Sequence, residues 1–157
     1  MRLASTVALG CCLLLLPLQG ASLARDVDGQ VFSSMSNEQL ASALTQAGLA
    51  AKVEVAKNGQ QFVVFKLQSG ATAVAAGGAC KDQGCAIFSL WVSFEPGSAD
   101  VNWANQWNQE HALIRAFVDN EGVYLQQDFI LLGGVTIAHV VAQCQFFNNV
   151  VSKATSQ

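Results

Sequence analysis

The sequence predicts an α+β fold in which an antiparallel sheet packs against three helices. Two observations carry this prediction. Short segments alternate apolar and polar residues as half-buried strands do, and three other segments place capping residues before apolar residues at helical spacing. The expected order is helix, three or four strands, helix, two strands, helix. The helices are expected on one side or at one end of the sheet.

The first helix is expected to begin after Ser36. Ser36 and Gln39 have the spacing of a capping box, in which each side chain bonds the backbone amide of the other residue. Met35 and Leu40 lie on either side of this cap as a hydrophobic staple pair. Gly48 ends the apolar face that follows, as glycine commonly does at a helix C-terminus.

A β-hairpin is expected next. Charged and apolar residues alternate from Lys52 to Lys57, and residues 62–67 form the returning strand. Between them lies Asn58-Gly59, the strongest short hairpin signal, because both residues tolerate positive φ. The sequence therefore predicts two paired strands joined by a tight turn.

Two further strand segments differ in strength. Residues 71–79 are a weak candidate, because alanine and glycine are poor strand formers. Residues 86–95 alternate clearly, and Pro96-Gly97 ends the pattern. The better core candidate in the stronger strand is the face made of Phe88, Leu90, Val92 and Phe94.

The second helix is expected over the stretch VNWANQWNQE, with Ser98 or Asp100 as its cap. A second hairpin follows, and its turn at residues 119–122 has glycine at the left-handed position. Gly133-Gly134 ends the hairpin, and the last helix begins at Thr136, with Val135 and Val140 as a staple pair. Its predicted core stripe is Ile137, Val141, Cys144, Phe147 and Val151, with Asn148, Ser152 and Lys153 off the stripe.

Residues 1–24 are expected to be a signal peptide. An apolar run from Val7 to Leu18 follows Arg2, and it is shorter than the ~20 residues of a membrane-spanning helix. The small residues Ser22 and Ala24 predict cleavage after Ala24. Cys11 leaves a lipoprotein interpretation open. Residues 25–157 would then form one domain in the periplasm or outside the cell.

The charge balance bears on partners. Loss of the leader removes Arg2, one of the eight basic residues, and leaves seven against eleven acidic residues. There is no basic cluster, so a nucleic acid partner is not expected. No later apolar run is long enough for a membrane span, so none is expected after cleavage.

Cys80 and Cys85 enclose a four-residue loop. If this loop joins antiparallel strands, their Cα atoms lie about 4.5–5.5 Å apart, within reach of a disulfide. An oxidising compartment favours a structural disulfide, while a redox-active pair and a metal site remain open alternatives. Cys144 lies on an apolar helical face and is expected to be a buried thiol.

No catalytic arrangement is apparent. His111 and His139 lie on different predicted helices, and the sequence contains neither a close histidine pair nor the nucleophile elbow G-x-S-x-G. We therefore expect no enzymatic activity, no cofactor and no metal.

The stretch from 101 to 109 is rich in side-chain amides and contains Trp103 and Trp107. Asparagine is a poor helix former, because its amide competes for backbone groups. The amides are expected to bond the backbone where the helix meets the next strand, with Trp107 anchored in the core. The alternative is a glycan-binding surface of tryptophan and asparagine side chains. It requires Trp91, Trp103 or Trp107 exposed on a common face, and it fails if all three are buried.

The segment NQWNQEHALIRAFVDNEGVYLQQDFILLGGVT resembles the YbjN family of bacterial proteins, and the resemblance covers roughly residues 32–150. The family's pattern has N-x-W-N, an R-A-x-x-D strand, an acidic strand and G-G-V-T. The matching positions are Asn105, Trp107, Asn108, Arg115, Ala116, Asp119, Gly122, Asp128, Gly133, Gly134, Val135 and Thr136.

The resemblance implies a fold similar to that of type III secretion chaperones and a role as a sensory transduction regulator. It further implies an unidentified protein or peptide partner, and a homodimer as one arrangement. Secretion chaperones are cytoplasmic, whereas this chain is expected to be exported, so a strict chaperone role is not expected. The motif residues are expected to be structural. Trp103 falls outside the motif and is the candidate for ligand binding.

Overall fold

A computed structural model describes residues 29–82, 84–94, 100–120 and 122–154. The predicted signal peptide, Cys11, Pro96-Gly97 and Ser98 lie outside the described residues. The elements in chain order are β1 (Val31–Phe32), α1 (Asn37–Gln46), β2 (Ala51–Val55), β3 (Gln61–Lys66), β4 (Thr72–Lys81), β5 (Gly84–Phe94), α2 (Val101–Glu110), β6 (Arg115–Val118), β7 (Val123–Ile130), β8 (Val135–Thr136) and α3 (Ile137–Ala154).

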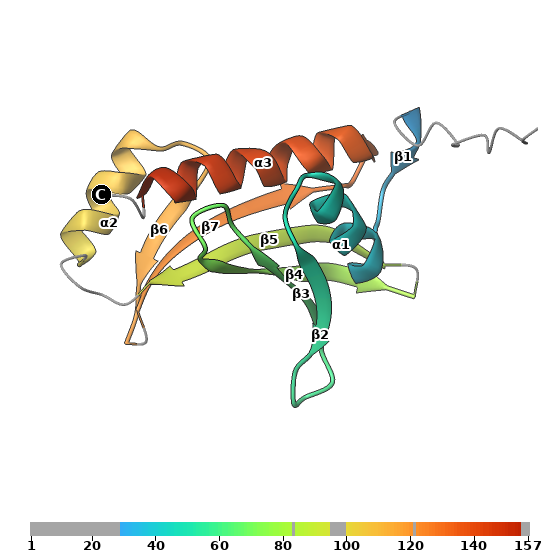
Figure 1. The fold of residues 1–157 in the computed structure, drawn as a ribbon, viewed down its shortest axis with the longest axis horizontal. Coiled ribbons are helices and arrows are strands. Elements are labelled where there is room, and N and C mark those ends of the chain that lie inside the picture. The colour runs from blue at the N-terminus through green and yellow to red at the C-terminus, as the bar shows by residue number, and fades with distance from the viewer. Residues whose placement is uncertain (1–28, 83, 95–99, 121, 155–157) are drawn as a thin grey trace, which may run out of the picture.

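The predicted α+β class is confirmed. Six strands form an antiparallel sheet in the order β2-β3-β4-β5-β7-β6, and β1 pairs with β8 in a small second sheet. In Figure 1, α3 runs across one face of the large sheet, with α1 near one end of it and α2 beside β6 at the other. The two-residue strands β1 and β8 were not predicted, because two residues are too few to show a period. No helix within the described residues has the length and apolar character needed to cross a membrane.

The start of α1 agrees with the sequence. The Ser36 side chain accepts a hydrogen bond from the Gln39 amide at 3.2 Å, and the Ser36 amide donates to Gln39 Oε1 at 2.8 Å. Met35 and Leu40 are both fully buried. The capping box and staple pair therefore fix where the chain enters the first helix.

The hairpin between β2 and β3 is present, but its turn is longer than the tight turn expected. The Ala56 amide donates to the Gln60 carbonyl, and the Gly59 amide donates to the Ala56 carbonyl. Gly59 has a φ of +83°, while Asn58 remains outside the positive-φ region and bonds the Gln60 amide through its side chain. The chain thus makes a three-residue turn in which glycine alone takes the left-handed position.

The weak strand candidate is a full member of the sheet, since β4 pairs with β3 on one side and β5 on the other. Ala73 and Ala75 are fully buried on the face that the helices cover. The low strand propensity of alanine and glycine did not predict this, because the strand is stabilised by hydrogen bonds to two neighbouring strands. On β5 the predicted core face is confirmed, with Phe88, Leu90 and Val92 buried and Phe94 partly buried.

The core lies between this face of the sheet and α3. Thr136 caps α3 by accepting a hydrogen bond from the His139 amide at 3.2 Å. Ile137, Val140, Cys144, Phe147 and Val151 are buried, whereas Val141 is only partly so. Asn148 was wrongly placed off this stripe. It is 2% exposed, and its Oδ1 accepts a 2.8 Å hydrogen bond from the Gln68 amide, which ties α3 to the loop after β3.

Candidate functional site

The sheet face opposite the helices carries an apolar band. Pairing between neighbouring strands places Val64 beside Val74, Val74 beside Trp91 and Trp91 beside Gln126. Val64 and Val74 are partly buried, and the Trp91 side chain is 37% exposed. An indole on an uncovered face presents a large apolar surface at a small cost in side-chain entropy.

A pair of aromatic rings lies next to this band. Phe117 on β6 and Tyr124 on β7 face each other in the sheet register and stack with ring centroids 4.9 Å apart, at 8° to each other. Both line a surface hollow of about 360 Å³, together with Trp91, Val74 and Thr72. This hollow, the stack and Trp91 form what we call the aromatic patch.

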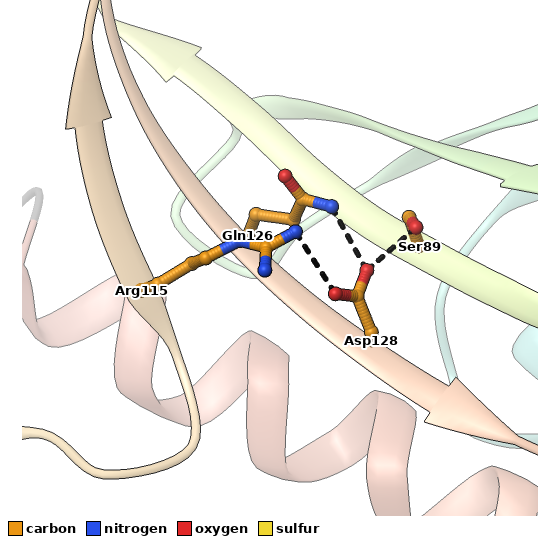
Figure 2. A network of polar contacts seen from close by, with 4 residues as sticks. All are labelled: Ser89, Arg115, Gln126 and Asp128. Carbon is orange, nitrogen blue, oxygen red and sulfur yellow. Dashed lines mark hydrogen bonds and ion pairs between the residues drawn. The ribbon is translucent and has the colours of Figure 1, made fainter.

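A polar network borders the aromatic patch (Figure 2). Asp128 on β7 lies at its centre, with Oδ2 2.9 Å from an Arg115 guanidinium nitrogen. Its Oδ1 accepts hydrogen bonds from Ser89 Oγ at 2.6 Å and from Gln126 Nε2 at 2.8 Å. The resemblance marked Arg115 and Asp128, and the structure brings them together as an ion pair. Both side chains remain partly open to solvent, so this ion pair adds little stability on its own.

The junction between α2 and β6 has the architecture that the amide-rich stretch predicts. The Asn108 side chain accepts a 2.7 Å hydrogen bond from the Ala116 amide and donates a 2.9 Å bond to the Ala116 carbonyl. Trp107 is 8% exposed, and its Nε1 donates to the Ile114 carbonyl at 2.7 Å. One side-chain amide therefore takes the place of a neighbouring strand along the outer edge of β6.

The three tryptophans do not share one face. Trp103 is partly buried and stacks on Trp107 at 5.5 Å, and Trp107 stacks on His111 at 3.8 Å. These rings line a hollow of about 540 Å³ between α2 and the end of α3. Trp91 lies on the open face of the sheet instead. The three tryptophans are not all buried, so the glycan interpretation stays a prediction that would rest on Trp91 or on Trp103.

The other motif positions shape turns. The Asp119 side chain accepts a hydrogen bond from the Gly122 amide at 3.1 Å. A Cβ atom at Gly122 would lie 2.7 Å from the Phe94 carbonyl oxygen, so only glycine fits there without a shift. Gly133 and Gly134 form the turn between β7 and β8, where the Gly134 amide donates to the Leu131 carbonyl. Asn105 is exposed on α2.

The expected cysteine pair is joined. Cys80 and Cys85 face each other across β4 and β5 and form a disulfide, with Cα atoms 3.8 Å apart, closer than expected. Cys85 also exchanges two backbone hydrogen bonds with Met35, just before α1. Cys144 is a free, buried thiol, and its burial raises its pKa to about 12. No group of three metal-ligating side chains occurs within the described ranges.

The aromatic patch was not predicted from the sequence. Phe117 and Tyr124 have no predicted role, and Trp91 enters only the glycan alternative. The signal was the alternation within residues 115–118 and 123–130, which places Phe117 and Tyr124 opposite the buried residues of each strand. Pairing between strands that are distant in sequence was needed to bring Trp91 beside them.

Comparison with known proteins identifies the family of this chain. A family model described as a putative bacterial sensory transduction regulator, YbjN, matches residues 36–155. A search of curated proteins finds no match. The match spans α1 to α3 and includes the α2–β6 junction and the Arg115–Asp128 pair. The chain therefore belongs to the YbjN family.

Proposed function

We propose that this protein is a non-enzymatic regulatory module that binds a protein or peptide on the open face of its sheet. The observation that carries the proposal is the aromatic patch: an exposed indole, a stacked Phe117–Tyr124 pair and a hollow, on a face that no described helix covers. The description of the family as a regulator supports a binding role.

The chemistry of the patch suits a polypeptide partner. Protein interfaces concentrate binding energy in a few aromatic and arginine side chains, surrounded by a polar rim. Here the rings of the aromatic patch supply the centre, and Arg115 with Asp128 supplies charges of both signs at its border. An extended peptide could place apolar side chains in the hollow and bond its backbone to the polar network.

Site-specific cross-linking tests this proposal. A photoreactive phenylalanine analogue replacing Trp91 should cross-link a defined partner in the expressing cell, whereas the same residue replacing Phe146 should not. Phe146 is the matched control, because it is an aromatic side chain of similar exposure, 39% against 37%, on α3. Cross-linking from both positions alike, or from Phe146 alone, would exclude the open face as the binding surface. Competition by oligosaccharides would instead favour the glycan interpretation.

We further propose that the chain is exported, with cleavage after Ala24. The short apolar run and the small residues before Arg25 support this proposal. Mass spectrometry of the purified protein should find Arg25 at the N-terminus, with the protein in the periplasmic or extracellular fraction. An intact Met1 would contradict export, and a lipidated Cys11 at the N-terminus would establish a lipoprotein.

A further inference from the structure

The edge strand β2 presents unpaired backbone groups. The Lys66 amide donates to the Ala50 carbonyl, and the Ala56 amide donates to the Gln60 carbonyl. With the strand register, these two bonds establish which residues of β2 direct their backbone N–H and C=O groups toward β3. Even-numbered residues of β2 therefore bond to β3, and the N–H and C=O groups of Ala51, Val53 and Val55 point away from the sheet. Within the described part of the chain, no hydrogen bond reaches these outward groups.

The side chains of β2 are self-complementary. Lys52 and Glu54 lie on the open face and form an ion pair at 2.6 Å, with side chains 70% and 39% exposed. The strand reads Ala-Lys-Val-Glu-Val, so its two charges are placed symmetrically about Val53. An antiparallel strand of the same sequence, centred on Val53, would set Lys52 of each copy opposite Glu54 of the other. Opposite charges facing each other stabilise strand pairs.

We infer that a second copy of this chain pairs with β2, edge to edge and antiparallel, with Val53 on the two-fold axis. Val53 would then exchange backbone bonds with its counterpart, and Ala51 with Val55 of the other copy. Val55, now 63% exposed, would be covered by that contact. The register is specific, because a centre at Lys52 or Glu54 would place like charges opposite each other, which is unfavourable.

The charges also select the partner. A lysine on an edge strand discourages pairing with arbitrary strands. A second copy places Glu54 opposite Lys52, so the lysine charge is paired and does not oppose this association. The resulting sheet would be continuous across both copies, and the two-fold axis perpendicular to it would leave both aromatic patches on the same side. The pairing does not depend on what the aromatic patch binds.

Sedimentation of the protein as purified from the expressing cell tests the pairing. The wild-type protein should form a dimer, and Lys52→Glu or Glu54→Lys should each weaken dimerisation roughly tenfold or more, because each creates two like-charge pairs per dimer. The exchanged variant with both substitutions should dimerise as the wild-type protein does. An equimolar mixture of the two single variants should form the mixed dimer.

The mixture is the decisive measurement. The two single variants can restore opposite-charge pairs in a mixed dimer only if residues 52 and 54 face each other across the interface, and a dimer through another surface would not show this. Circular dichroism of each variant establishes that it is folded, as expected for exposed side chains. A wild-type protein that remains monomeric up to its solubility limit would overturn the inference. So would a dimer that both single variants leave intact, or a mixture that fails to associate.

Discussion

The two edge strands of the large sheet, β6 and β2, differ in how their outward-facing backbone groups are hydrogen-bonded. At β6, side chains of α2 bond the outward-facing backbone. Asn108 bonds both the amide and the carbonyl of Ala116, and Trp107 donates to the carbonyl of Ile114. At β2 the corresponding groups of Ala51, Val53 and Val55 are unoccupied within the described residues, and only a pair of charges marks the edge. An exposed edge invites pairing with another chain. Trp107 and Asn108 of the N-x-W-N pattern thus close the β6 edge, whereas β2 has no such contact within the described residues.

Removing the anchor of the closed edge should have the largest effect. Trp107→Ala should lower the free energy of unfolding by about 3–5 kcal/mol, because it leaves a cavity and an unbonded Ile114 carbonyl. Urea unfolding followed by circular dichroism measures this change. Trp103→Ala is the control and should cost clearly less, since Trp103 is only partly buried. Equal losses would mean that the ring stack, rather than the anchor, stabilises the junction.

Proline should distinguish the two edges directly. Ala116→Pro removes an amide that donates to Asn108 and should lower the free energy of unfolding by about 2 kcal/mol or more. Val55→Pro removes an outward amide that bonds no described residue, so it should change monomer stability by less than about 1 kcal/mol. Thermal unfolding of both variants, at a concentration where the protein is monomeric, makes the comparison. A larger loss at Val55 would contradict the assignment of β2 as the open edge.

The edge-closing amide alone should have a smaller effect. Asn108→Ala removes two hydrogen bonds at a site that water can reach, so it should destabilise the protein by about 1 kcal/mol. Asn105→Ala, one turn earlier, should change stability by less than about 0.5 kcal/mol, because the Asn105 side chain is exposed. Urea unfolding of the two variants separates a specific amide from a general effect of asparagine in this helix. Equal losses would remove the special role of Asn108.

The smallest expected effect is the pH dependence of α2, the helix that closes the edge. Hydrogen bonds from the Trp103 and Asn102 amides lower the pKa of the Asp100 carboxyl, which caps this helix. Its stabilisation is therefore fully present above the ordinary aspartate pKa and is lost as the pH falls through the lowered value. A carbon-13 titration of the carboxyl should find its midpoint below the ordinary value. Asp100→Asn should remove this pH dependence, and a midpoint at or above the ordinary value would contradict the cap.

The sequence predicted the closed edge better than the open one. The junction could be anticipated because Asn108 and Ala116 are close in the chain, and asparagine in a helix signals a local use. The helix start at Ser36 and the core face of β5 were predictable for the same reason, as local patterns. The aromatic patch was not, because Trp91 meets Tyr124 and Phe117 only through strand pairing. The buried Asn148 was missed because its partner, Gln68, lies 80 residues away.

The Asn108–Ala116 contact also has a kinetic consequence. Its partners are eight residues apart, and those of the Trp107–Ile114 bond are seven apart. Loops of about this length close in ~10–100 ns, far faster than a sheet with distant pairings assembles. The β6 edge can therefore be shielded while the rest of the sheet is still unformed, when exposed strands are most prone to aggregate. The junction would then protect the chain during folding before it serves the finished structure.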